Sequence, residues 1–125
     1  MIISTITESS NPIAPEVFYD IDESAGDASG ENMSLQWNRV GYNPTYLVYK
    51  MNTQGNWVKI HEFESNEDVV YLPLTETSLT PEELSIIDGE SENVFHHFRV
   101  DVENSAGLFN ITKNLITIPG DKLID

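Results

Sequence analysis

The sequence contains no cysteine, and this absence excludes several kinds of site at once. Without thiols the chain forms no disulfide, has no thiolate nucleophile, and lacks cysteine ligands for zinc or redox chemistry. Its stability must therefore come from packing. The 125 residues suit one domain, which would bury roughly two-thirds of the surface that its unfolded chain exposes.

Basic residues and long apolar runs are also scarce. Six Lys and Arg stand against 21 Asp and Glu, which gives a formal net charge of -15 at pH 7. Such a chain repels nucleic-acid phosphates and anionic lipid, so we expect no nucleic-acid partner. The apolar run at residues 69–72 is far too short to cross a bilayer, so no membrane insertion is expected. The acidity itself names no partner, because solvated acidic surfaces are common.

The motifs of common enzyme classes are missing as well. We find no glycine-rich phosphate loop, no serine nucleophile elbow, and no carboxylate pair in a recognisable acid/base spacing. The histidines are His61, His96 and His97. The adjacent pair must point to opposite faces of a strand, so the two cannot chelate one ion together. We therefore expect a protein that is not an enzyme.

What the sequence does have is a period-two alternation of apolar residues, broken at short intervals by turn residues. Residues 33–37 place Met33, Leu35 and Trp37 on one face, which we expect to be core. Further strands are predicted at residues 46–50, 57–60, 68–74, 98–103 and 109–118. Pro73 lacks an N–H group and is therefore expected at a strand end or a sheet edge.

One helical turn or two is predicted to interrupt the strands, from Pro81 to Ile87. Thr80 suits the N-cap, Pro81 suits the first helical position, and Glu83 completes a capping box. Gly89 is expected to end the helix.

Residues 98–107, Phe-Arg-Val-Asp-Val-Glu-Asn-Ser-Ala-Gly, resemble the sixth-strand signature of fibronectin type III domains. Trp37 is similar to the family's second-strand tryptophan, residues 46–49 resemble its third strand, and residues 13–15 resemble the start of its first strand. The resemblance implies an all-β, immunoglobulin-like antiparallel two-sheet sandwich of about seven strands. The domain would span residues 13–119, with an N-terminal segment at 1–12 and a tail at 120–125.

The chain departs from the family pattern in three places. His96 stands where the family has a corner tyrosine that hydrogen-bonds back to the chain, so that contact is in doubt here. The other departures are a long acidic loop at residues 23–32 and the predicted helix. Both lie where insertions are tolerated.

An acidic loop offers the one metal-like pattern in the chain. Asp20, Asp22, Ser24 and Glu31 occupy the first, third, fifth and twelfth positions of a calcium-loop spacing. That spacing wants glycine at the sixth position, where Ala25 stands, and helices on both sides, where strands are predicted. The loop is either a weak calcium site or simply a solvated acidic loop, and no other cofactor is expected.

The N-terminal segment is rich in β-branched residues, among them Ile2, Ile3 and Ile6. One interpretation is an arm that adds a strand to the sheet edge of a neighbouring subunit. The other is that this segment forms the domain's own first strand or frays.

The resemblance to fibronectin type III domains implies a scaffold whose loops and edges bind a partner. Together with the acidity and the absence of a secretory signal at residues 1–7, it favours a bacteriophage virion structural protein. We expect a head decoration or auxiliary protein, made in the host cytoplasm and attached in many copies to capsid or other virion proteins.

The alternative is an extracellular fibronectin type III module of a cell-surface or glycan-associated protein, which would mediate adhesion or carbohydrate binding. Its candidate contact residues are the aromatic side chains of Tyr42, Trp57 and Phe95.

Overall fold

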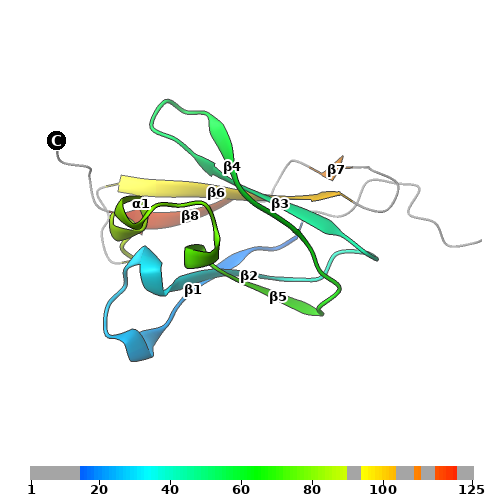
Figure 1. The fold of residues 1–125 in the computed structure, drawn as a ribbon, viewed down its shortest axis with the longest axis horizontal. Coiled ribbons are helices and arrows are strands. Elements are labelled where there is room, and N and C mark those ends of the chain that lie inside the picture. Colours follow the sequence, from blue (N-terminus) through cyan, green and yellow to red (C-terminus); the bar gives the residue numbers. More distant parts are fainter. Residues whose placement is uncertain (1–14, 90–93, 104–108, 111–114, 121–125) are drawn as a thin grey trace, which may run out of the picture.

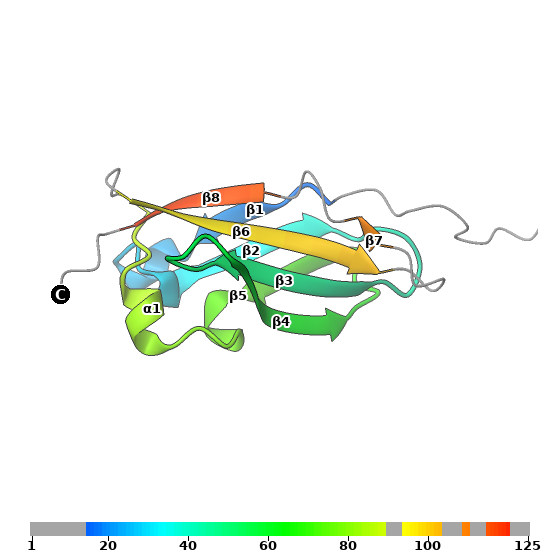
Figure 2. The ribbon, with the colours of Figure 1, turned by 90° about the horizontal axis from the view of Figure 1, so that it is seen from above.

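The computed structural model describes residues 15–89, 94–103, 109–110 and 115–120 of the chain. These residues form two antiparallel sheets that lie as two layers, with little helix (Figures 1 and 2). The expectation of a mostly β protein with two antiparallel sheets is confirmed. About seven strands were expected, and the described residues form seven in addition to one strand of two residues.

The smaller sheet has three strands in the order β1-β2-β5. Their bounds are β1 (Phe18–Ile21), β2 (Met33–Asn38) and β5 (Val69–Pro73). Pro73 ends its strand, as expected for a residue that cannot donate to the ladder. Gln36 in the central strand lies opposite Phe18 on one side and Tyr71 on the other. β1 and β5 are thus the edges of this sheet.

The larger sheet has the order β4-β3-β6-β7, and a further strand, β8, also pairs with β6. The bounds are β3 (Thr45–Met51), β4 (Trp57–Glu64), β6 (Val94–Glu103), β7 (Phe109–Asn110) and β8 (Leu115–Gly120). The last strand predicted at 109–118 is described only at its two ends, as β7 and β8, because residues 111–114 lie outside the described residues. β7 pairs with the end of β6, whereas β8 pairs with its beginning and includes Gly120.

The core lies between the two layers, where the alternating residues of both sheets meet. Met33, Leu35 and Trp37 are buried, as the alternation predicted. The β6 residues that were expected on one face are also fully buried, namely Phe98, Val100 and Val102. Burial of large apolar side chains is the main favourable term in folding such a domain.

Tyr46 supplies a hydrogen bond between side chain and backbone that fixes the chain between β2 and β3. Its ring meets Trp37 edge-on, with centroids 5.2 Å apart, and its hydroxyl oxygen accepts the N–H of Val40 at 3.1 Å. Burial raises the pKa of Tyr46. A tyrosine-to-backbone contact thus exists in this fold, on β3 rather than at the position of His96 on β6.

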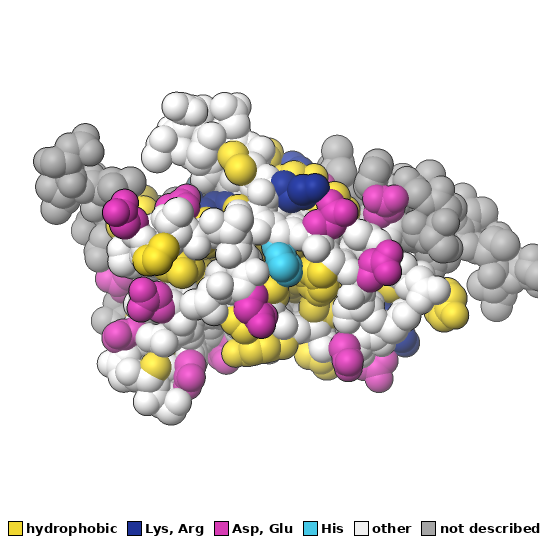
Figure 3. Space-filling model, viewed as in Figure 1, with side chains coloured by type: hydrophobic (Ala, Val, Ile, Leu, Met, Phe, Trp, Pro, Cys, Tyr) yellow, Lys and Arg dark blue, Asp and Glu magenta, His cyan; other side chains and the backbone are white. Residues whose placement is uncertain are grey.

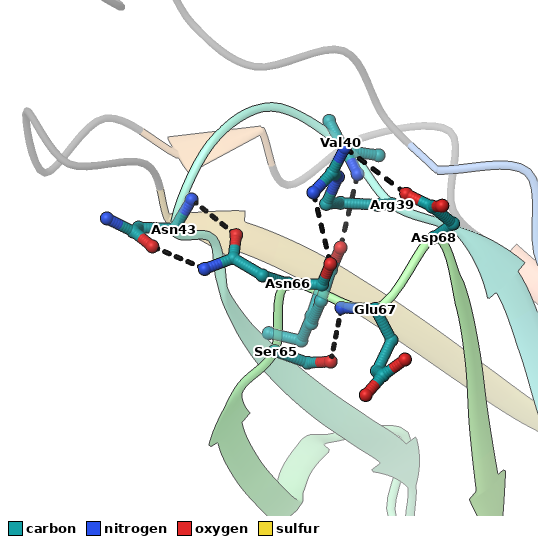
Figure 4. A network of polar contacts seen from close by, with 8 residues as sticks. Arg39, Val40, Asn43, Ser65, Asn66, Glu67 and Asp68 are labelled. Carbon is teal, nitrogen blue, oxygen red and sulfur yellow. Dashed lines mark hydrogen bonds and ion pairs between the residues drawn. The ribbon is translucent and has the colours of Figure 1, made fainter.

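Two loops are tied together where β2 leads into β3 and β4 leads into β5 (Figure 4). Arg39 donates through Nη1 to the Asn66 carbonyl at 3.0 Å and forms an ion pair with Asp68 at 3.3 Å. The side chain of Asn66 accepts the N–H of Asn43 at 3.0 Å, and Asn43 has a positive φ of 49°. These contacts fix the point at which β5 begins.

The predicted helix exists as α1 (Pro81–Ser85), and its start is confirmed. The Thr80 hydroxyl accepts the Glu83 N–H at 3.1 Å and the Glu83 carboxylate accepts the Thr80 N–H at 3.0 Å, which is a complete capping box. The predicted end at Gly89 is wrong. The helix stops at Ser85 because the next residues enter isolated bridges, in which the Ile87 carbonyl accepts the Gly30 N–H at 2.7 Å.

The acidic loop between β1 and β2 contains two 3-10 turns, η1 (Glu23–Ala25) and η2 (Gly30–Asn32), and a third, η3 (Leu74–Glu76), follows β5. Gly30 is buried against α1, where an added Cβ would lie 2.6 Å from the Leu84 carbonyl oxygen. This close contact brings the acidic loop and the helix together at one end of the molecule.

Candidate functional sites

The residues of the predicted calcium loop lie in three different elements. Asp20 lies in β1, Asp22 caps η1, and Glu31 lies in η2. Asp22 Oδ1 accepts both the N–H of Ser24 at 3.1 Å and its hydroxyl at 2.6 Å. Across the ranges that the structure describes, no group of three or more His, Cys, Asp or Glu side chains could hold a metal ion. The calcium site therefore stays a prediction from sequence spacing.

The histidine pair lies on β6 and behaves as expected. His96 faces the interior and is 7% exposed. His97 faces the other way, where its Nδ1 lies 3.0 Å from the Thr117 hydroxyl oxygen. The two rings therefore cannot share an ion. The predicted arm residues Ile2, Ile3 and Ile6 lie outside the described residues, as does the predicted turn at 104–107.

The aromatic residues considered for an adhesive patch do not gather on one surface. Tyr42 lies in the loop between β2 and β3, whereas Phe95 lies at the beginning of β6. Trp57 lies against the guanidinium of Arg99, whose Cζ is 4.9 Å from the centre of the indole ring. These residues therefore offer no common platform for a sugar.

Arg99 is the centre of a polar cluster on the outer face of the larger sheet. Its guanidinium also lies 4.4 Å from the ring centre of Tyr49. Its Nε lies 3.1 Å from Asp101 Oδ1, and its Nη2 donates to Oδ2 at 3.1 Å. Asp101 is 3% exposed. Burial raises the pKa of the Asp101 carboxyl and the charge of Arg99 opposes this change, so the cluster is held together as an ion pair with stacked rings.

The outer face of the smaller sheet carries an exposed apolar group of three residues, which we call the apolar face. Phe18 of β1 is 57% exposed, and Val69 and Tyr71 of β5 are each 59% exposed. Phe18 and Tyr71 pair with Gln36 of β2 from opposite sides. Phe18, Gln36 and Tyr71 therefore form one row across the sheet.

The sequence contains a signal for this face, although the face was not among the predicted sites. Residues 69–72 are all apolar, whereas an antiparallel strand with one solvated face alternates apolar and polar residues. Val70 and Leu72 are buried in the core. Their neighbours Val69 and Tyr71 must then be apolar residues on the outside.

Acidic side chains flank the apolar face. Glu16 and Asp20 lie two residues either side of Phe18 and are exposed, and the side chain of Asp68, next to Val69, is 90% exposed. Figure 3 shows hydrophobic side chains reaching the surface along the lower edge of the view, with acidic side chains to either side. The face is thus an apolar centre with an acidic surround.

A different kind of site lies at the end of the sandwich that carries α1. Tyr46 and Val48 of β3 point into the core, and Lys50 is the next residue on that face. Lys50 lies opposite Val58 of β4 and Phe98 of β6. A lysine therefore occupies a core-facing position, directly before the strand ends.

The side chain of Lys50 borders a cavity of about 340 Å³, which we call the Lys50 hollow. Its lining comes from the end of β3 and the turn that follows, from α1, and from the start of β6. The lining residues are Lys50, Met51, Asn52, Thr53, Glu83, Ile86, Val94, Phe95 and His96. A smaller cavity of about 140 Å³ is also lined by Lys50, together with Ile60 and Leu79.

The charged groups of the Lys50 hollow are perturbed by burial. Burial lowers the pKa of Lys50, and the nearby negative charge of Glu83 opposes this change. Burial also lowers the pKa of His96 to about 4, the charge of Lys50 adds to the effect, and the backbone of Ile86 opposes it. At neutral pH the hollow therefore contains a neutral imidazole and a partly desolvated ammonium group.

No family model matches this chain, and no curated protein or solved structure is detectably similar to it. No helix in the described part of the chain is long and apolar enough to span a bilayer.

Proposed function

We propose that this protein is a non-catalytic structural protein that binds other proteins and attaches in many copies to a virion, as a head decoration or auxiliary protein. The observation that carries the proposal is the apolar face of Phe18, Val69 and Tyr71. Exposed apolar side chains that lie together, surrounded by polar residues, are typical of protein-binding surfaces. On a symmetric lattice a modest interface of this kind gains strength through avidity.

The division of strands between the sheets supports a fibronectin type III-like domain. β1, β2 and β5 form one sheet, and β3, β6 and β8 belong to the other. This division agrees with that of the first, second and fifth strands against the third, sixth and last strands in immunoglobulin-like sandwiches. Sandwiches of this type present binding surfaces on a rigid frame, which suits a display or attachment role.

The chemistry of the apolar face specifies its partner. The exposed acidic residues around it favour a partner with an apolar centre and a basic rim. Two copies of this chain would bring acidic surrounds together, which makes self-association through the face unfavourable. In the virion role proposed above, such a partner would be a capsid or other virion protein with a basic attachment site.

The first test is mass spectrometry of purified particles, in which many copies of the chain per particle are expected. The second test uses Phe18→Ser and Tyr71→Ser, which remove apolar contacts from the face without opening the core. Each variant should bind particles at least about tenfold more weakly, the loss typical of a residue central to an interface.

The control variant is Tyr42→Ser, which changes an aromatic residue that is 66% exposed but lies outside the apolar face. It should bind particles as the wild type does, and Phe18→Ser and Tyr71→Ser should keep a wild-type melting temperature. Absence of the chain from particles would refute the virion role. Unchanged binding by Phe18→Ser and Tyr71→Ser would instead refute the assignment of the face.

The alternative function, an extracellular module that binds carbohydrate, is favoured by one observation on the same face. Phe18 and Tyr71 lie two strands apart, roughly 10 Å at ordinary strand spacing, and aromatic rings on a flat sheet can stack on sugars. Binding to a glycan array that Tyr71→Ser abolishes, with no binding to particles, would favour this alternative.

A further inference from the structure

The Lys50 hollow is separate from the apolar face and is not explained by protein attachment there. It lies between α1, the β3–β4 turn and the start of β6, whereas the apolar face lies on β1 and β5. Its volume of about 340 Å³ falls at the lower end of the range of small-ligand sites. Most of its wall is apolar, supplied by Met51, Ile86, Val94 and Phe95.

Lys50 differs from the other basic residues that the structure describes. Arg39, Lys59 and Arg99 each have a carboxylate oxygen within 4.0 Å, at 3.3, 2.6 and 3.1 Å. Among the residues that the structure describes, no carboxylate oxygen lies within 4.0 Å of Lys50. Its Nζ donates to the carbonyl oxygen of Met51 at 3.3 Å, and one such bond does not use all the donors of an ammonium group. A half-buried ammonium with free donors beside an apolar cavity is arranged to receive an anionic oxygen.

The neighbours of Lys50 favour an anion with a single negative charge over a dianion. Glu83 also lines the hollow, and its carboxylate is fixed by the capping box of α1. The chain as a whole is strongly acidic. Glu83 repels any anion in the hollow, but it repels a dianionic phosphate about twice as strongly as a carboxylate, whose single charge the Lys50 ammonium can match.

We propose that the Lys50 hollow binds a monocarboxylate with an apolar body, whose carboxylate accepts from the Lys50 ammonium and whose apolar part packs against Ile86 and Phe95. The α1 helix and the residue that follows it form one side of the hollow, through Glu83 and Ile86. Two sources offer this chemistry, a free small carboxylic acid and the carboxylate at the end of a peptide. The proposal is independent of the virion role.

The test is a titration of the 15N-labelled full chain followed by NMR, with matched pairs of probes. The first pair is 3-phenylpropionate and its neutral amide, and the second is a tripeptide ending in phenylalanine with a free or an amidated C-terminus. At least one carboxylate should shift the amide signals of Thr53, Ile86 and Phe95. It should bind at least about tenfold more tightly than its amide, the ratio expected for one charge-assisted hydrogen bond.

The variant that isolates the charge is Lys50→Met, which keeps the aliphatic stem and removes the ammonium. It should bind the carboxylate and the amide equally. The matched control is Lys59→Met, which removes an exposed lysine paired with Glu62 and should keep the wild-type preference. If only 3-phenylpropionate binds, the hollow accepts a free small carboxylic acid. If only the tripeptide with a free C-terminus binds, the hollow accepts the end of a peptide.

Two results would overturn the proposal. The first is equal binding of carboxylate and amide by the wild-type protein, a comparison that needs no variant to fold. The second is the absence of signal shifts at the hollow for either carboxylate at millimolar concentration. A carboxylate preference that persists in Lys50→Met would also contradict it, since the charge would then lie elsewhere.

Discussion

Acid should destabilise this protein through one buried residue, His96. Its ring is 7% exposed and faces the core side of β6. The groups around it are Lys50, whose positive charge opposes a second cation, Glu83, which lines the same hollow, and His97 on the outer face. Protonation of His96 would therefore place a charge in a site that disfavours it.

The magnitude follows from the pKa of His96. In the unfolded chain the imidazole titrates near 6.5, whereas burial lowers the pKa to about 4 in the folded protein. Between these values the unfolded state binds more protons, so the free energy of unfolding falls as pH falls. Between pH 7 and pH 4 the loss is about 3 kcal/mol, a large fraction of the stability of a domain of this size.

The assay is urea unfolding at several pH values for the wild type, His96→Gln and the matched control His97→Gln. Carboxylates also titrate below pH 5, so the informative quantity is the difference between two proteins at each pH. The wild type should lose about 3 kcal/mol more than His96→Gln between pH 7 and pH 4, and His97→Gln should follow the wild type.

Parallel stability curves for the wild type and His96→Gln would refute the reasoning. The His96 ring can also be followed directly by NMR in the wild-type protein, which needs no variant to fold. A titration midpoint near 6.5 rather than near 4 would refute the predicted burial effect on its pKa.

Two further predictions concern stability and use the same urea assay. Arg99→Met should lower the free energy of unfolding by about 3 kcal/mol, because it leaves the buried Asp101 carboxylate without its partner; Lys59→Met, which breaks an exposed pair, should leave it nearly unchanged. Gly120→Ala should cost about 2 kcal/mol or more, because its Cβ would lie 2.2 Å from the buried His96 ring. Wild-type stability of either destabilised variant would contradict the packing described here.

Local signals in the sequence predicted the elements that depend on local chemistry. The alternation at residues 33–37 placed Met33, Leu35 and Trp37 in the core, and this is confirmed. The start of α1 was also predicted correctly, because a capping box involves only residues three apart. Such features need no knowledge of the rest of the fold.

Non-local contacts account for the errors. The end of α1 is set by bridges from Ile87 and Asp88 to Gly120 and Ser29, which no pattern within the helix reveals. The predicted last strand is tested only at its two ends, where β7 and β8 both pair with β6, because residues 111–114 lie outside the described residues.

The candidate sites show the same limit. The apolar face was visible in principle, because the continuous apolar run at residues 69–72 must place Val69 and Tyr71 outside once Val70 and Leu72 are buried. The Lys50 hollow could not be predicted in this way. Lys50 follows Val48 in the core-facing alternation, and in the sequence it indicates only the polar end of a strand. Only the position of α1 over this end turns the lysine into the wall of a cavity.

The two proposed sites are built from different elements of the fold. In a sandwich without α1, the inward position of Lys50 at the end of β3 would open to water, and its ammonium would bind a carboxylate weakly. The apolar face depends instead on β1, β5 and the Arg39–Asp68 contacts that fix where β5 begins. Changes to one site should then leave the other intact, so Lys50→Met should bind particles normally and Tyr71→Ser should keep its preference for carboxylates.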